Sequence, residues 1–111
     1  MNKEKYINLD YQPDENTRLE LESLNKAKEN LSKFNLNQAN LEKINLVNAV
    51  MENSNLSRAN LKNASLYGMN LSGSNLFKTN FENANLNGAN LENCDLLGTN
   101  LTNTKLRNIK W

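Results

Sequence analysis

The most regular feature of the chain is a large apolar residue at every fifth position from Leu31 to Trp111. An α-helix has about 3.6 residues per turn and a strand alternates about every 2 residues, so neither keeps a five-residue spacing on one side. The chain must therefore turn a corner every five residues, which predicts a solenoid. The 17 apolar positions follow one another without a gap: Leu31, Leu36, Leu41, Leu46, Met51, Leu56, Leu61, Leu66, Leu71, Leu76, Phe81, Leu86, Leu91, Leu96, Leu101, Leu106 and Trp111.

The five-residue register stops upstream of Leu31, because the preceding slot holds Lys26. We therefore place a boundary near residue 30, with residues 1–30 as an amino-terminal cap and residues 31–111 as the repeat domain. Such a cap would cover the strand edge and the apolar cross-section of the first coil. The alternative is that residues 1–30 form a disordered acidic leader.

Two short elements are predicted within the cap. Thr17 and Glu20 have capping-box spacing, which predicts a helix that begins at Thr17 and continues to about Glu29. Pro13 ends an earlier segment, which is predicted to be extended and contains the apolar residues Tyr6, Ile7, Leu9 and Tyr11.

The five-residue period alone does not determine how many sides close one coil. If four five-residue sides close one coil, residues 20 apart lie one above another; a three-sided coil, known for hexapeptide repeats, is the alternative. The unit is a small residue, Asn or Asp, Leu and two variable residues, as in Ala39-Asn40-Leu41-Glu42-Lys43 and Ala89-Asn90-Leu91-Glu92-Asn93. Over residues 29–111 the sequence resembles the pentapeptide repeat family. The resemblance implies an all-β solenoid, a right-handed quadrilateral β-helix of about four coils at ~4.8 Å each, with the Leu and the small residue facing inward.

The outward residues fit the four-sided closure. At a spacing of 20 residues, Glu42, Lys62 and Glu82 fall in one column, so charges of opposite sign alternate along the stack. Asn precedes the apolar residue in 12 of the 17 units and is interpreted as a turn residue that tolerates unusual backbone angles, with a side chain that can also hydrogen-bond along the axis. Four bulky residues occupy the small slot, three of them in the first or last coil: Phe34, Ile44, Met69 and Ile109.

Composition argues against catalysis. The net charge is +1, divided into −2 for residues 1–30 and +3 for residues 31–111, and there is no histidine. The single cysteine, Cys94, falls in an inward slot, where burial raises a thiol pKa. The acids are not clustered at metal-ligand spacing. We therefore expect no enzyme activity and no catalytic, cofactor or metal site.

The same features bear on location. One cysteine cannot form an internal disulfide, and the first residues are charged where a secretory signal would be apolar. No stretch approaches the roughly 20 apolar residues of a membrane span. These observations predict a cytoplasmic protein without membrane contact, and the Asn and Lys content is typical of an AT-rich bacterial genome.

Outward apolar residues mark a candidate interaction surface. Phe77 and Leu97 share one column, flanked by Arg58 and Lys78, while the opposite side carries Val47 and Tyr67. These side chains have no core to fill, so they suggest a contact surface. The alternative is that they are ordinary scattered surface apolars.

The carboxyl end of the sequence suggests self-association. Ile109 and Trp111 fall in inward slots, and no helix follows them to cover the last coil. End-to-end pairing with a second copy would hide this cross-section. We therefore predict a homodimer through the carboxyl-terminal coil.

Two functions are compatible with these features. The first is a non-catalytic scaffold that presents rigid β-helix faces to a protein partner whose identity the sequence does not specify. The second comes from the resemblance: some pentapeptide repeat proteins protect DNA gyrase by imitating DNA. The short length and the lack of acidic faces argue against that role. Nucleic-acid binding is also disfavoured, because the basic residues are spread over several faces and aromatic residues are few.

Overall fold

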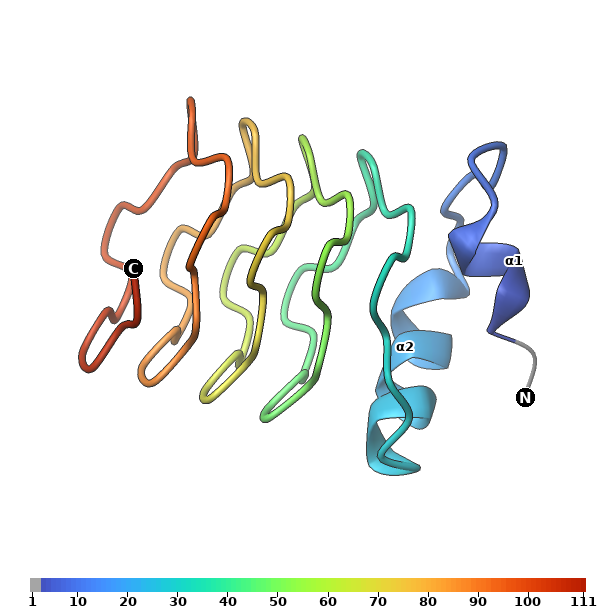
Figure 1. The fold of residues 1–111 in the computed structure, drawn as a ribbon, viewed down its shortest axis with the longest axis horizontal. Coiled ribbons are helices and arrows are strands. Elements are labelled where there is room, and N and C mark those ends of the chain that lie inside the picture. Colours follow the sequence, from blue (N-terminus) through green and yellow to red (C-terminus); the bar gives the residue numbers. More distant parts are fainter. Residues whose placement is uncertain (1–2) are drawn as a thin grey trace.

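The computed structural model describes residues 3–111, which form two helices followed by a stack of coils. Helix α1 spans Glu4–Ile7 and helix α2 spans Thr17–Lys26. Figure 1 shows both helices at one end of the stack, next to its first coil, with the carboxyl terminus at the other end. The coils contain isolated parallel bridges in place of long strands. Every bridge joins residues 20 apart, from Asn35 with Asn55 to Asn90 with Lys110, so four pentapeptides complete one coil.

Each corner is a turn built from a single pentapeptide. In one of them the Lys62 amide donates to Asn60 Oδ1 over 3.0 Å, and the Ala64 amide donates to the Leu61 carbonyl over 3.1 Å. Asn63 lies between them with φ of 61°, the left-handed conformation that the third residue of a type II turn requires. Asn tolerates this conformation better than most residues. The Asn before Leu61 therefore takes part in the turn through its side-chain oxygen, whereas the unusual backbone angle falls on the corner residue Asn63 and not on Asn60.

The coils are joined by hydrogen bonds that run along the stack. The Leu61 amide donates to the Asn80 carbonyl in the following coil over 2.8 Å, and the Asn60 amide donates to the Ala39 carbonyl in the preceding coil over 2.9 Å. Side-chain amides add to this ladder at one column, where Asn60 Nδ2 donates to Asn40 Oδ1 over 3.4 Å. The backbone of each inner coil is therefore tied to both of its neighbours.

The interior is lined by the residues that the repeat predicts. The central apolar residues from Leu31 to Leu91 are at most 2% exposed, and the small residues beside them are also buried. Hydroxyl groups in the small slot donate hydrogen bonds to backbone carbonyls of the preceding coil, as Thr79 Oγ1 does to the Leu56 carbonyl over 2.7 Å. Every buried side-chain N or O atom within residues 3–111 has a hydrogen-bond partner. The hydrogen bonds therefore offset the cost of removing these small polar side chains from water.

Two local predictions for the amino-terminal segment were wrong. The residues before Pro13 include the helical turn α1 in place of a continuous extended segment, with Tyr6 buried and Leu9 88% exposed. The capping box at the start of α2 does not form. The Thr17 hydroxyl accepts the Asp14 amide over 2.9 Å, and the Glu20 carboxylate instead accepts hydrogen bonds from Tyr6 and Lys5.

Helix α2 ends at Lys26, earlier than the predicted Glu29. Lys28 adopts φ of 59°, its amide donates to the Asn25 carbonyl over 2.9 Å, and the Glu29 amide donates to the Leu24 carbonyl over 3.0 Å. These two bonds are the Schellman pattern, which satisfies the last helical carbonyls and redirects the chain. The chain then enters the first coil.

Contacts from the amino-terminal segment satisfy the edge of the first coil. The Tyr6 ring stacks on Phe34 at 4.9 Å between centroids, and the Tyr6 carbonyl accepts the Asn35 amide over 2.6 Å. Glu22 Oε2 accepts the Asn45 amide over 2.9 Å. In later coils the equivalent amides donate to the coil before them, so this segment replaces part of a missing coil.

Candidate interaction surface

The outward charges are divided unequally among the four sides of the stack. We name two opposite sides after their outward aromatic residues: the Phe77 side is residues 36–40, 56–60, 76–80 and 96–100, and the Tyr67 side is residues 46–50, 66–70, 86–90 and 106–110. Neither side contains an acidic residue. The carboxylates of residues 31–111 all lie on the other two sides: Glu42, Glu52, Glu82, Glu92 and Asp95.

On the Phe77 side, the structure brings together all four residues that the sequence suggested. The Arg58 guanidinium lies 5.0 Å from the centroid of the Phe77 ring, and Lys78 Nζ lies 5.2 Å from it. The backbone ladder fixes their spacing, because the Arg58 amide donates to the Phe77 carbonyl over 2.8 Å. Leu97 follows one coil further along and is 70% exposed. The result is a half-buried ring under two cations beside an exposed leucine.

Gly98 leaves room for the Lys78 side chain beside it. A Cβ atom at position 98 would lie 2.9 Å from Lys78 Cγ, closer than real Cβ contacts allow. Gly98 also has φ of 72°, as the corner requires. The absence of a side chain at this position therefore helps to place the ammonium group over the Phe77 ring.

On the Tyr67 side, the two predicted residues have different surroundings. Tyr67 is 53% exposed, whereas Val47 is half-buried beside the end of helix α2. Asn25 Nδ2 donates to the Val47 carbonyl over 3.1 Å, and a groove of about 390 Å³ beside it is lined by residues that include Lys26 and Val50. Contact with the helix segment accounts for Val47, so Tyr67 is the better candidate for an outside partner.

The carboxyl-terminal coil exposes its cross-section. Leu96, Leu101, Leu106 and Ile109 are only partly buried, although the equivalent residues of inner coils are enclosed, and Trp111 is 62% exposed. The equivalent Leu36 amide donates to Asn55 in the following coil. Within residues 3–111, no such partner is found for the amides of the three leucines in the last coil.

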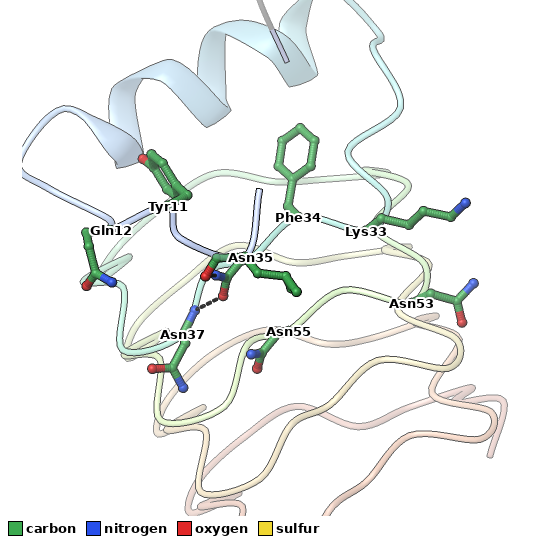
Figure 2. A pocket seen from close by; sticks show the side chains of 9 residues that line it. Tyr11, Gln12, Lys33, Phe34, Asn35, Asn37, Asn53 and Asn55 are labelled. Carbon is green, nitrogen blue, oxygen red and sulfur yellow. Dashed lines mark hydrogen bonds between the residues drawn. The ribbon is translucent and has the colours of Figure 1, made fainter. Parts of the chain in front are cut away.

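A groove that the sequence did not indicate lies where the amino-terminal segment meets the first coils. Figure 2 shows Tyr11 and Gln12 on one side of it and Asn35, Asn37 and Asn55 on the other. Its volume is about 390 Å³, and several of its amides are already engaged: Asn35 Nδ2 donates to the Leu9 carbonyl over 3.0 Å. No periodic signal marks such a groove, because its walls come from distant segments that pack together only in the folded chain.

The thiol of Cys94 and the carboxylates are the side chains to consider for reaction or metal binding. Burial raises the pKa of the Cys94 thiol, whose Sγ lies 3.1 Å from the Leu71 carbonyl to which it donates. No group of three or more Cys, Asp or Glu side chains within residues 3–111 is arranged to hold a metal ion. Among those same residues, neither helix has the length and apolar character that crossing a bilayer requires.

Comparisons with known proteins agree with the repeat architecture. A family profile described as "Pentapeptide repeats (8 copies)" matches residues 35–73 and 74–110. The chain therefore belongs to the pentapeptide repeat family. The comparison with curated proteins gave no match.

Several solved pentapeptide repeat structures are similar to this chain. One from the cyanobacterium Cyanothece 51142 is 46% identical, with a TM-score of 0.72, over 74% of this chain and 56% of that protein. One from Nostoc Pcc 7120 is 29% identical, with a TM-score of 0.72, over 86% of this chain and 78% of that protein. One from the thylakoid lumen of Arabidopsis thaliana is 33% identical, with a TM-score of 0.64, over 68% of this chain and 53% of that protein. The match thus spans little more than half the length of the first and third proteins.

Proposed function

We propose that this protein is a non-catalytic scaffold, a capped right-handed quadrilateral β-helix of four coils whose outer faces bind a macromolecular partner. The hydrogen-bond ladder supports this, because it holds outward side chains of successive coils at a fixed spacing. A preorganised surface loses little conformational entropy when it binds. The cap would be residues 1–30, whose described part supplies Tyr6 and Glu22 to the open edge of the first coil.

The observation that carries this proposal is the Phe77 side. Its exposed Leu97 and its cation-covered ring occupy outward slots, and the other outward slots of this side, apart from the two cations, hold Asn, Gln, Ser and Gly. Aromatic and Arg side chains are enriched at protein interfaces, and exposed apolar groups rimmed by polar ones mark them. A protein partner is therefore the best match for this face.

Face-specific photo-crosslinking in the host cell tests the proposal. We expect a photoreactive phenylalanine analogue at position 97 to capture a partner protein. The same analogue at Thr102 is the control, because Thr102 is exposed and occupies the equivalent slot of the next pentapeptide on an acid-bearing side. Equal capture at both positions, or none at either, would contradict a partner-binding Phe77 side.

A double substitution then tests the residues themselves. Phe77→Ser with Leu97→Ser should leave the fold intact, because Ser57 already occupies the same column in the preceding coil. The variant should retain the circular dichroism spectrum of the original protein and no longer co-purify with the partner that the analogue at position 97 captured. Undiminished partner binding would make the apolar pair incidental.

We further propose a homodimer through the carboxyl-terminal coil, with Ile109 and Trp111 near the contact. The exposed apolar cross-section and the unpaired leucine amides of that coil support it. Sedimentation should give twice the 12.6 kDa mass of one chain, and Ile109→Lys should reduce the mass to that of one chain. A mass of 12.6 kDa for the unaltered protein at micromolar concentration would refute the dimer.

The competing role, gyrase protection by DNA imitation, is disfavoured by the charges. A DNA mimic needs acidic faces, whereas two sides of this stack lack acids altogether and the repeat tract has a net charge of +3. A supercoiling assay with gyrase and a quinolone decides between the two roles. Protection by the purified protein would favour the mimic.

A further inference from the structure

The Phe77 side contains a pair of like charges that the rest of the stack avoids. Arg58 and Lys78 are 20 residues apart, so they occupy the same slot in adjacent coils. Like charges directly opposite on neighbouring strands are unfavourable. On an acid-bearing side the equivalent arrangement pairs opposite charges, with Lys62 Nζ 3.9 Å from Glu82 Oε1. The fold therefore accommodates alternating charges, and the Phe77 side departs from that pattern.

No carboxylate among the described residues pairs with either of these cations. Within residues 3–111, neither Arg58 nor Lys78 forms an ion pair, whereas Lys110 on the opposite side reaches Glu92 at 3.2 Å. Both cations instead lie over the Phe77 ring. Two positive charges thus stand together on an acid-free face, where an external anion would gain from both.

The surroundings of the pair indicate what carries that anion. Leu97 is 70% exposed in the coil after Phe77, so an apolar group and two cations are presented side by side. Two cations already lie over the Phe77 ring, which disfavours stacking of a nucleic-acid base there. Phosphate-backbone binding uses many cations, and this side has two. These features favour an acidic protein segment over a nucleic acid.

We propose that the Phe77 side binds a carboxylate-rich segment of a partner protein. Acidic side chains of that segment pair with Arg58 and Lys78, and a neighbouring apolar side chain packs on Leu97. This inference rests on the proposed scaffold function and specifies the chemistry of the partner.

Binding of short labelled peptides, followed by fluorescence anisotropy, tests the chemistry. The probe is a synthetic peptide in which Glu alternates with Leu, and its matched control has Gln in place of Glu. The Glu peptide should bind more tightly than the Gln peptide, and its affinity should fall as salt is added, because exposed charge pairs are screened. Equal affinity for the two peptides would overturn the proposal.

Paired variants locate the binding. Arg58→Gln with Lys78→Gln should weaken binding of the Glu peptide by about tenfold, the loss expected for two partly exposed ion pairs. The substitution suits the backbone, because Gln38 occupies the same column with φ of 62°. The control is Lys33→Gln with Lys43→Gln, which removes the same charge from corner positions of other sides that also have positive φ. Equal weakening by both pairs would mean attraction to overall charge and would overturn a specific site.

Binding of a different ligand to the Phe77 side would give a distinguishable result in these experiments. Binding of an oligothymidine that the Arg58 and Lys78 substitutions abolish, without binding of the Glu peptide, would assign the site to nucleic acid and overturn the proposal. A concentration-dependent increase in mass that the same substitutions abolish would assign it to a second copy of the chain. If residue 97 captures a partner in cells but the Glu peptide fails to bind, the scaffold function stands and the acidic-segment proposal fails.

Discussion

The contact between the amino-terminal segment and the first coil gives the most direct energetic prediction. Tyr6 is completely buried, with its ring 4.9 Å from the rings of both Tyr11 and Phe34 between centroids. Replacing a buried aromatic residue by Ala costs about 3–5 kcal/mol, including the loss of ring pairs that contribute about 0.5–1.5 kcal/mol each. Because small domains have only about 5–15 kcal/mol of stability, Tyr6→Ala should lower the free energy of unfolding by a large fraction.

Urea unfolding followed by circular dichroism measures this loss. Ile7→Ala is the matched control, since Ile7 follows Tyr6 in helix α1 but is 46% exposed, and it should cost less than about 1 kcal/mol. Limited proteolysis should also cut residues 1–30 faster in Tyr6→Ala than in Ile7→Ala. If the two variants have the same unfolding free energy, residues 1–30 do not act as a packed cap.

Three further predictions concern the coils and the amino-terminal segment. Thr79→Val removes the hydroxyl donor to the Leu56 carbonyl at nearly constant volume, so urea unfolding should show a loss of about 0.5–1.5 kcal/mol; an unchanged midpoint would contradict it. Gly88→Asn should be nearly neutral in thermal unfolding, because Asn48 and Asn108 hold positive φ in the same column, whereas Gly88→Val should cost about 1–2 kcal/mol; equal costs would refute the conformational argument. Hydrogen bonds from Lys5 and Tyr6 lower the pKa of the Glu20 carboxyl, so its stabilising contribution is present above its unfolded-state pKa, about 4.3, and is lost as the pH falls through the lower folded-state pKa. Glu20→Gln should therefore reduce the loss of melting temperature below about pH 4.3, and an identical acid profile would exclude this role.

The candidate surface was partly predictable from the sequence, because the five-residue repeat also sets which outward residues share a column. A spacing of 20 residues, once assumed, places Phe77 under Leu97 and Arg58 under Lys78, and the structure has that register. The same spacing could also have revealed the two acid-free sides. It could not reveal that Val47 lies beside helix α2 and Tyr67 does not, because a contact with a non-repeating segment has no period.

The sequence by itself determined the coil, because each pentapeptide carries its own turn. Asn accepts the amide two residues ahead, the corner residue takes a positive φ, and the Leu can only turn inward. Because these interactions lie within five residues and repeat along the chain, few other conformations are open to each pentapeptide.

Tertiary structure alone decided how the stack begins. The stacking of Tyr6 on Phe34 and the pairing of Glu22 with Asn45 join positions far apart in sequence. The capping box predicted at Thr17 does not form, because Glu20 accepts a hydrogen bond from Tyr6 instead. Burial of a tyrosine with this hydrogen bond contributes more free energy than an exposed helix cap.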